Sequence, residues 1–205
     1  MSTIHKNTAG AKHKIRIIGG QFKRTPIPVA DIQGLRPTPD RVRETVFNWI
    51  NHLWDSNYND KSVLDLFAGT GALGFEAASR GASHVQMVEY NKDALANLRQ
   101  LRDKLNLQQV RINSGDAMLV LKRMDASRFD LVFLDPPFEK DLIQEVIPYL
   151  PGILKPGSLV YMESEKKIRL DLPFELLKEG KAGAVFYQLY QFSNPIQDTA
   201  IKPPF

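Results

Sequence analysis

The sequence predicts an α/β protein built on a doubly wound, mainly parallel sheet, and three features indicate this. Short apolar runs alternate with amphipathic stretches between residues 61 and 163, a pattern typical of parallel strands covered by helices on both faces. A glycine-rich turn follows the first of these runs, and an Asp-Pro-Pro-Phe tetrad follows a later one. With 205 residues, of which 43% are hydrophobic, the chain is long enough for one domain with its own core.

The N-terminal part is expected to form a β-hairpin. Its strands are expected at residues 14–18 and 21–23, joined by a turn at Gly19-Gly20. Pro26 and Pro28 then favour an extended sheet edge, because proline lacks the N–H group that an inner strand needs.

A helix should follow this hairpin. Thr38 is expected to cap it, and Pro39 suits its first position. Its apolar residues recur at helical spacing: Val42, Val46, Ile50 and Leu53. Arg43 falls on another face, where it reaches a ligand or water, or forms a structural pair with Glu44.

The rest of the chain alternates strands and helices and ends with a hairpin. Strands are expected at residues 62–66, 84–90, 110–113, 129–134 and 159–163. Helices are expected at residues 72–79, 91–105, 118–124 and 139–150, the last one ended by Pro151 and Gly152. Two final strands, 174–178 and 184–192, should add an antiparallel hairpin joined by residues 179–183.

The positive charge of the chain is concentrated at its N-terminus. Residues 1–43 hold nine Lys and Arg against two acids, whereas the remainder holds 18 against 21, and the whole chain has a net charge of +4. A basic arm on a mildly acidic body is typical of proteins that bind nucleic-acid phosphates, although a solubilising tail has the same composition. The candidate RNA-binding residues are Lys14, Arg16, Lys23, Arg24, Arg36 and Arg41.

Composition also excludes several classes of protein. The chain has no Cys and its four His are scattered, so neither disulfides nor a metal site is expected. It has no run of 18 apolar residues and no apolar leader segment. A cytoplasmic protein without membrane contact is therefore expected, with a monomer as the default.

The glycine-rich turn predicts a site for a nucleoside cofactor. Its Gly-x-Gly-x-x-Gly spacing between a strand and a helix suits a nicotinamide-dependent oxidoreductase equally well. Asp65, four residues before the first Gly, favours S-adenosylmethionine. A carboxylate attracts the cationic groups of that cofactor but repels a pyrophosphate, at a cost of about 4 kcal/mol for unit charges ~4 Å apart at an effective dielectric constant of about 20. The expected cofactor-binding residues here are Asp65, Phe67, Ala68, Gly69, Thr70 and Gly71.

Further cofactor contacts are expected after the next two strands. Glu89 lies 20 residues after the first Gly, where a carboxylate can accept both hydroxyls of a ribose diol. Asp116 and the backbone N–H of Ala117 are expected to bind the adenine ring. The alternative for Asp116 is a common Gly-Asp turn that caps a helix.

The tetrad Asp135-Pro136-Pro137-Phe138 predicts methyl transfer to the exocyclic amine of a base. Such an amine is a poor nucleophile because its lone pair is delocalised into the ring. Hydrogen bonds from its two protons to the Asp135 carboxylate and the Pro136 carbonyl would direct the lone pair at the methyl group, which is catalysis by positioning and electrostatics. Phe138 offers a face on which the base can stack.

These residues resemble the class I amino-group methyltransferases, whose fold is a seven-stranded Rossmann-like sheet. The runs Arg16-Ile17-Ile18-Gly19-Gly20, Gly34-Leu35-Arg36-Pro37-Thr38 and Asp40 to Trp49 are similar to the bacterial family that methylates N2 of the guanine at position 966 of 16S ribosomal RNA. The resemblance covers residues 14–195 and implies an RNA-binding hairpin-and-helix extension in residues 1–54, followed by a methyltransferase domain in residues 55–205. It implies ribosomal RNA, in an assembled or assembling small ribosomal subunit, as partner.

Three other functions remain open. The tetrad is shared with adenine-N6 methyltransferases of DNA or RNA, although this chain is short for a protein that also reads a DNA sequence. The glycine turn alone allows a nicotinamide-dependent oxidoreductase. An RNA-binding protein with an inactive enzyme fold would require the tetrad to be idle.

Overall fold

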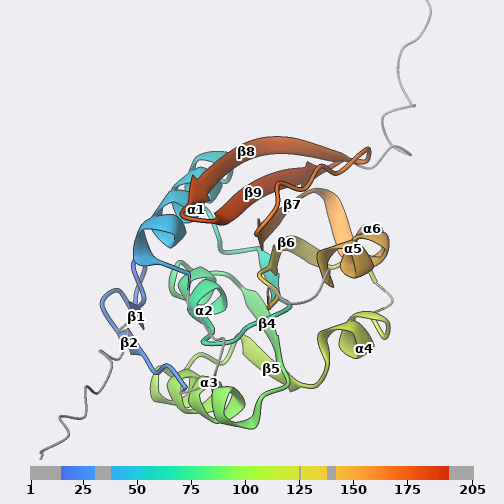
Figure 1. Ribbon diagram of the computed structural model, residues 1–205. Helices are drawn as coiled ribbons and strands as arrows, with labels where there is room; N and C mark the ends of the chain where they lie inside the picture. The colour runs from blue at the N-terminus through green and yellow to red at the C-terminus, as the bar shows by residue number, and fades with distance from the viewer. Residues whose placement is uncertain (1–14, 31–37, 125, 138–141, 194–205) are drawn as a thin grey trace, which may run out of the picture.

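The computed structural model describes residues 15–30, 38–124, 126–137 and 142–193 (Figure 1). Seven strands form one sheet in the order β5-β4-β3-β6-β7-β9-β8. Their bounds are β3 Ser62–Asp65, β4 His84–Glu89, β5 Val110–Ser114, β6 Phe129–Leu134, β7 Leu154–Ser164, β8 Phe174–Ala182 and β9 Val185–Phe192. Strands β3 to β7 are parallel, and β9 is antiparallel to both β7 and β8. The predicted fold class is confirmed.

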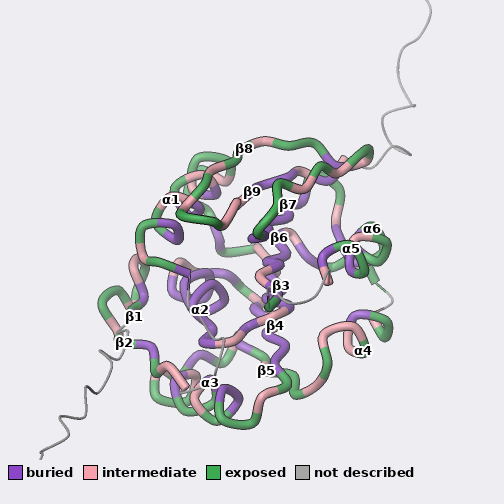
Figure 2. The backbone as a smooth tube through the Cα atoms, in the orientation of Figure 1, coloured by how far each residue is buried: buried purple, intermediate pink, exposed green. Residues whose placement is uncertain are grey.

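Helices cover both faces of this sheet. They are α1 Asp40–Leu53, α2 Ala72–Ser79, α3 Lys92–Lys104, α4 Ala117–Leu121, α5 Leu142–Val146 and α6 Leu150–Ile153, with a 3-10 turn at Ile147–Tyr149. Alternate strand residues face opposite layers: Val63 packs in a cluster with α1, α2 and α3, and Leu64 in a cluster with α4, α5 and α6. Buried residues accordingly predominate along the inner strands (Figure 2).

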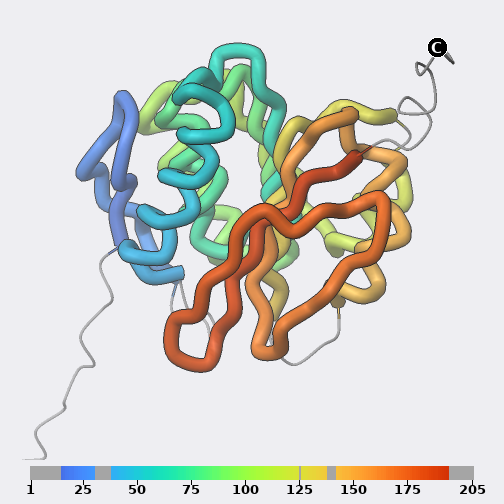
Figure 3. Tube along the Cα trace, turned by 90° about the horizontal axis from the view of Figure 1, so that it is seen from above, coloured from blue at the N-terminus to red at the C-terminus, as the bar shows by residue number. Residues whose placement is uncertain are grey.

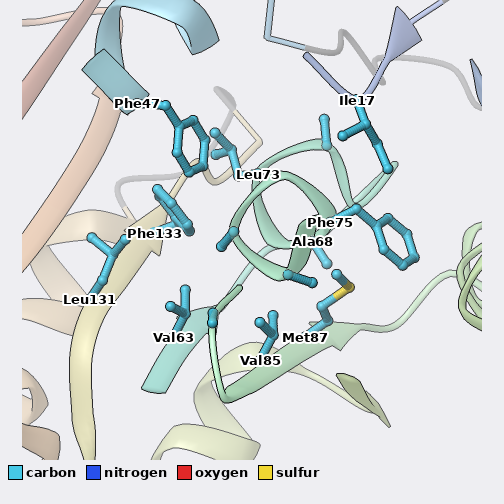
Figure 4. Close-up of a cluster of buried hydrophobic side chains, with 14 of the residues drawn as sticks. Ile17, Phe47, Val63, Ala68, Leu73, Phe75, Val85, Met87, Leu131 and Phe133 are labelled. Carbon is cyan, nitrogen blue, oxygen red and sulfur yellow. The ribbon is translucent and has the colours of Figure 1, made fainter. Parts of the chain in front are cut away.

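Helix α2 is enclosed on all sides. All eight of its residues are buried, which explains why six of them are Ala, Leu, Gly or Phe and why these do not form a single apolar stripe. Val63, Val85 and Met87 lie between α2 and the sheet, while Ile17 and Phe47 contact the cluster from the N-terminal segment and α1 (Figure 4). The N-terminal part therefore shares one hydrophobic core with the sheet.

The N-terminal hairpin exists, but the predicted pairing of 14–18 with 21–23 is wrong. Strand β1, Ile15–Arg16, pairs with β2, Pro26–Ile27, and residues 21–24 form turns between them. Gly20 explains the difference, because it has a φ of 73° and a Cβ there would lie 1.9 Å from the Ser79 carbonyl oxygen. The chain thus turns against the end of α2, beside α1 (Figure 3).

A buried carboxylate fixes this turn to α2. Glu76 is 0% exposed and accepts hydrogen bonds from the backbone N–H groups of Ile18 at 2.6 Å and Gly19 at 2.7 Å. Two guanidinium groups balance its charge: Arg80 at 2.8 Å and, more distantly, Arg43 at 3.9 Å. Such a pairing is what allows a charged side chain to be buried.

Two predicted boundaries near the C-terminus are also wrong. Pro151 and Gly152 do not end the helix but lie inside α6, where Pro151 occupies the first turn and needs no N–H partner. Residues 179–182 belong to β8, so the turn to β9 is confined to Gly183-Ala184. No helix among the described residues is long and apolar enough to cross a membrane.

Candidate active site

Three carboxylates lie at the carboxyl ends of neighbouring strands. Asp65 ends β3, Asp135 follows β6, and Glu163 is the second-last residue of β7. In the sheet register, Asp65 is opposite Phe133, which in turn is opposite Tyr161. Because side chains alternate along a strand, all three carboxylates face the α1 and α2 side of the sheet. This edge is where doubly wound folds bind ligands.

The turn after β3 brings its backbone close to α2 and α3. Gly71 has a φ of 77° and precedes α2, and a Cβ there would lie 2.4 Å from the Leu98 side chain. Asp65 Oδ2 accepts a hydrogen bond from the Gly74 N–H at 3.0 Å. The predicted residues Phe67, Ala68, Gly69 and Thr70 lie along this same turn and range from buried to half-buried.

Glu89 closes the turn from the neighbouring strand. One of its oxygens accepts the Gly69 N–H at 2.7 Å, and the other accepts the N–H groups of Tyr90 and Asn91 at 2.9 and 2.8 Å. Its carboxylate is 8% exposed, while the adjacent Tyr90 ring is 72% exposed. Carboxylate oxygens can accept more than one hydrogen bond each, so the predicted diol contact remains geometrically open to Glu89.

Burial changes the acidity of Asp65. Removal from water raises its pKa to about 7, the Gly74 N–H opposes the rise, and the negative charge of Glu89 adds to it. A cationic group beside Asp65 would favour its charged form. The carboxylates of Asp65 and Glu89 at this turn would repel a diphosphate and attract a cation, so these acceptors fit a cationic nucleoside better than a dinucleotide.

The third expected cofactor contact lies at the start of α4. Asp116 caps this helix, accepting the Leu119 N–H at 3.0 Å, and Ala117 is its first residue. The helix-cap alternative for Asp116 is therefore confirmed, at least for one of its carboxylate oxygens. A first-turn N–H such as that of Ala117 has no partner within its own helix, so it is available to a ligand.

Asp135 is joined to Glu163 through a hydroxyl group. Thr38 Oγ1 lies 3.3 Å from Asp135 Oδ2 and 2.9 Å from Glu163 Oε1, and the Tyr161 hydroxyl donates to the same Glu163 oxygen at 2.8 Å. Burial, with the charges of Glu163 and Asp65, raises the pKa of Asp135 well above its usual range, while the Thr38 hydrogen bond opposes the rise. Burial also raises the pKa of Glu163.

Thr38 was predicted to cap α1, and this prediction is wrong. The residue before α1 is Pro39, and no side chain caps the helix. Thr38 instead faces the two carboxyl groups, 5% exposed. Sequence reasoning also missed Glu163 and Tyr161; their one signal was a charged residue at the end of an otherwise apolar strand, at the ligand-binding edge.

The remaining tetrad residues are only partly described. Pro136 is buried and Pro137 is exposed, directly after Asp135. Phe138 lies outside the described residues, as do Lys14 and Arg36 among the predicted RNA-binding residues. No group of three or more potential metal ligands occurs in the described part of the chain.

The other predicted RNA-binding residues lie on the surface of the hairpin and α1. Lys23, Arg24 and Arg41 are exposed, and Arg16 is 60% exposed but pairs with Asp40 at 3.4 Å. Arg43 reaches neither ligand nor water.

Arg43 is 0% exposed and holds the segment before α1 in place. Its guanidinium donates to Asp40 at 2.5 Å and to the carbonyl oxygens of Arg16 at 2.9 Å and Thr38 at 3.2 Å. Its ion pairs are with Asp40 and, at 3.9 Å, with Glu76, whereas the structural pair considered from the sequence was with Glu44. The sequence could not show that Arg43 is buried, because its charge is balanced partly by Glu76, which lies on another helix.

The chain is similar to known proteins along most of its length. Residues 15–191 match a family model described as conserved hypothetical protein 95. Ribosomal RNA small subunit methyltransferase D of Haemophilus influenzae is 41% identical over 196 residues, which cover 90% of this chain and 97% of that protein. The solved structure of yhhF of Escherichia coli, described as a candidate methyltransferase, is 39% identical with a TM-score of 0.77 and covers 88% of this chain and 98% of its own.

A more distant structure shares the fold alone. An RNA methyltransferase of Salinibacter ruber, solved in complex with S-adenosyl-L-homocysteine, is 18% identical with a TM-score of 0.59 and covers 83% of this chain and 98% of its own.

Proposed function

We propose that this chain, which belongs to the conserved hypothetical protein 95 family, is an S-adenosylmethionine-dependent methyltransferase that modifies the exocyclic N2 amine of a guanine in 16S ribosomal RNA. The similarity to a small subunit ribosomal RNA methyltransferase over 90% of the chain supports the RNA substrate. The single observation that carries the chemistry is the Asp135 carboxylate at the sheet edge, beside the cofactor turn that begins at Asp65.

The cofactor would be held by the turn after β3 and its neighbours. Asp65 lies where it can face a cationic group, Glu89 where it can accept ribose hydroxyls, and Asp116 with Ala117 where they can meet the adenine. When bound, S-adenosylmethionine supplies a methyl group on a positively charged sulfur, which keeps the electron pair of the broken bond.

The chain's own contribution is to orient the acceptor amine. Asp135 and the carbonyl oxygen of Pro136 would accept its two hydrogens, which would turn the nitrogen lone pair toward the methyl group. Phe138 would then stack on the base after it has left the RNA stack. An ionised Asp135 accepts this hydrogen bond most strongly, because a charge-assisted hydrogen bond is stronger than a neutral one.

Transfer of methyl groups to small-subunit RNA tests this function. We expect the protein to methylate 16S ribosomal RNA from cells that lack the gene, and nucleoside analysis to find N2-methylguanosine. Naked RNA and assembled subunits should be compared in parallel, since a small-subunit partner is expected. N6-methyladenosine as the product would favour the adenine-specific alternative, and a lack of transfer to either substrate would contradict the proposal.

RNA affinity should depend on the basic surface of the hairpin. Replacing Lys14, Arg16, Lys23 and Arg24 with Ala is expected to weaken binding and to lower the log–log salt slope by roughly 0.7 to 0.9 for each phosphate that is no longer neutralised. Arg16 should contribute least, because Asp40 already pairs with it at 3.4 Å. A salt titration of RNA binding measures the slope, and single-turnover kinetics at saturating RNA should show an almost unchanged rate.

A variant of equal charge change provides the control. The control replaces Lys61, Lys104, Arg111 and Lys155, which lie outside the hairpin, at or near the amino ends of β3, β5 and β7 or at the end of α3. If both quadruple variants change the salt slope equally, the effect comes from net charge and the hairpin has no specific part in RNA binding.

A further inference from the structure

A buried hydroxyl group bridges the carboxyl groups of two neighbouring strands. Thr38 Oγ1 is within hydrogen-bonding distance of Asp135 Oδ2, at 3.3 Å, and of Glu163 Oε1, at 2.9 Å. Thr38 and Glu163 are each 5% exposed, whereas Asp135 keeps some exposure at the end of β6. In this chain of polar groups, Asp135 is therefore the end that solvent can reach, and Glu163 is the buried end.

The number of available protons constrains this arrangement. A threonine hydroxyl has one proton, so it can donate to only one of two ionised carboxylates. Glu163 Oε1 already accepts from the Tyr161 hydroxyl at 2.8 Å and is the nearer acceptor for Thr38. The longer contact, between Thr38 and Asp135, becomes a hydrogen bond when one of the two carboxyl groups is protonated. Two buried carboxylates so close together also resist simultaneous ionisation.

We propose that Glu163 is a positioning residue for methyl transfer, which acts on Asp135 through the Thr38 hydroxyl so that the two carboxyl groups hold one proton between them. This inference rests on the proposed function. The consequence is that Asp135 becomes a stronger base than an isolated carboxylate, because a negative neighbour favours its protonated form.

A stronger base at Asp135 suits the proton balance of the reaction. When the amine nitrogen gains a methyl group it becomes positively charged, and it must then lose one proton. Breaking the N–H bond and forming an O–H bond on Asp135 returns the nitrogen to neutrality and leaves the former carboxylate as an acid. Proton transfer is most efficient when the base is tuned toward the working pH, and an ordinary aspartate is too weak for that.

The charged and titratable groups around the pair come from four other positions. Asp65 on β3 adds negative charge near Asp135, and Arg43 on α1 opposes the effect of burial on Glu163. Tyr161 lies on β7 beside Glu163, and Tyr187 of β9 is opposite Glu163 in the sheet register. The four groups are shared by all variants below, so differences among these variants report on the pair itself.

The pH dependence of single-turnover methyl transfer tests the proposal. At saturating cofactor and RNA, the rate should rise with pH as Asp135 ionises. Glu163→Gln keeps an oxygen that accepts from Thr38 and Tyr161 but removes the negative charge, so the pKa of Asp135 falls. The rising limb of the profile should therefore move to lower pH, by about one unit. The plateau rate should fall because Asp135 becomes a weaker base.

Replacing the bridge should move the profile in the same direction. Thr38→Val has nearly the same shape but cannot bridge the two carboxyl groups, so the shared proton is no longer held between them and the rising limb should again move to lower pH. Thr38→Ser keeps the hydroxyl and should match the wild type. A merely structural role would lower the rates of both Glu163→Gln and Thr38→Val without moving the rising limb, and that result would overturn the proposal.

Infrared titration of the protein without RNA separates this inference from the proposed function. The absorption of protonated carboxyl groups should retain one component near neutral pH that Glu163→Gln removes and Thr38→Ser does not. Asp65 titrates in the same range, with a pKa raised to about 7, but it is present in every variant and cancels in the difference spectra. Equal spectra for the wild type and Glu163→Gln would exclude a shared proton, whatever the substrate of the enzyme proves to be.

Discussion

Replacing Asp135 with Ala is expected to lower the single-turnover rate of methyl transfer by about a hundredfold or more, while cofactor affinity changes little. The physical reason is that Asp135 is a preorganised acceptor in a partly buried site, and removing one such group typically costs that order of rate. Asp135 makes its hydrogen bond with Thr38 and not with the cofactor turn. Single-turnover kinetics and calorimetric titration with S-adenosylmethionine measure the two effects separately.

Two variants control for general disruption of β6. Asp135→Asn keeps an acceptor oxygen but cannot take a proton, so its rate should lie between those of the wild type and Asp135→Ala. Asp130→Asn alters the other end of the same strand, where the carboxylate binds Lys155 at 2.7 Å and the Ser62 N–H at 2.8 Å, and it should leave the rate unchanged. A near wild-type rate for Asp135→Ala would show that the tetrad does not bind the amine.

The sheet and its helices could be predicted because their pattern is local. Alternating apolar and amphipathic runs indicated five parallel strands and the helices between them, and the boundaries of α2 at residues 72–79 agree with the structure. The edge that carries Asp65, Glu89 and Asp135 also followed from the sequence, since residues that end parallel strands meet at one edge. The roles assigned to these residues remain predictions.

The wrong predictions for Thr38 and for the N-terminal hairpin have a different cause: both depend on contacts between residues that are far apart in the sequence. Thr38 looked like a helix cap because the preference for Thr before a helix is local, but its hydroxyl finds two carboxyl groups 97 and 125 residues away in the sequence. The hairpin took a different register because Gly20 packs on Ser79 of α2. Pairing partners of this kind depend on sheet register, which no short stretch of sequence reveals.

The largest effect on stability is expected at Glu76. Replacing it with Gln should lower the free energy of unfolding by about 3–5 kcal/mol, because removing one partner of a buried ion pair leaves the other charge uncompensated. Arg80, which pairs with Glu76 at 2.8 Å, is only 14% exposed, and Arg43 at 3.9 Å is fully buried. Urea unfolding of the wild type and the variant measures the difference.

An exposed ion pair provides the matched control for this substitution. Glu179 binds Lys167 at the similar distance of 2.7 Å, but both side chains are about 40% exposed, so Glu179→Gln should cost less than about 1 kcal/mol. Glu76→Gln should also speed hydrogen exchange at the N–H groups of Ile18 and Gly19, which Glu76 accepts, ahead of the sheet. Equal losses of stability in the two variants, with unchanged exchange at these two amides, would mean that hydrophobic contacts and not Glu76 hold the hairpin against α2.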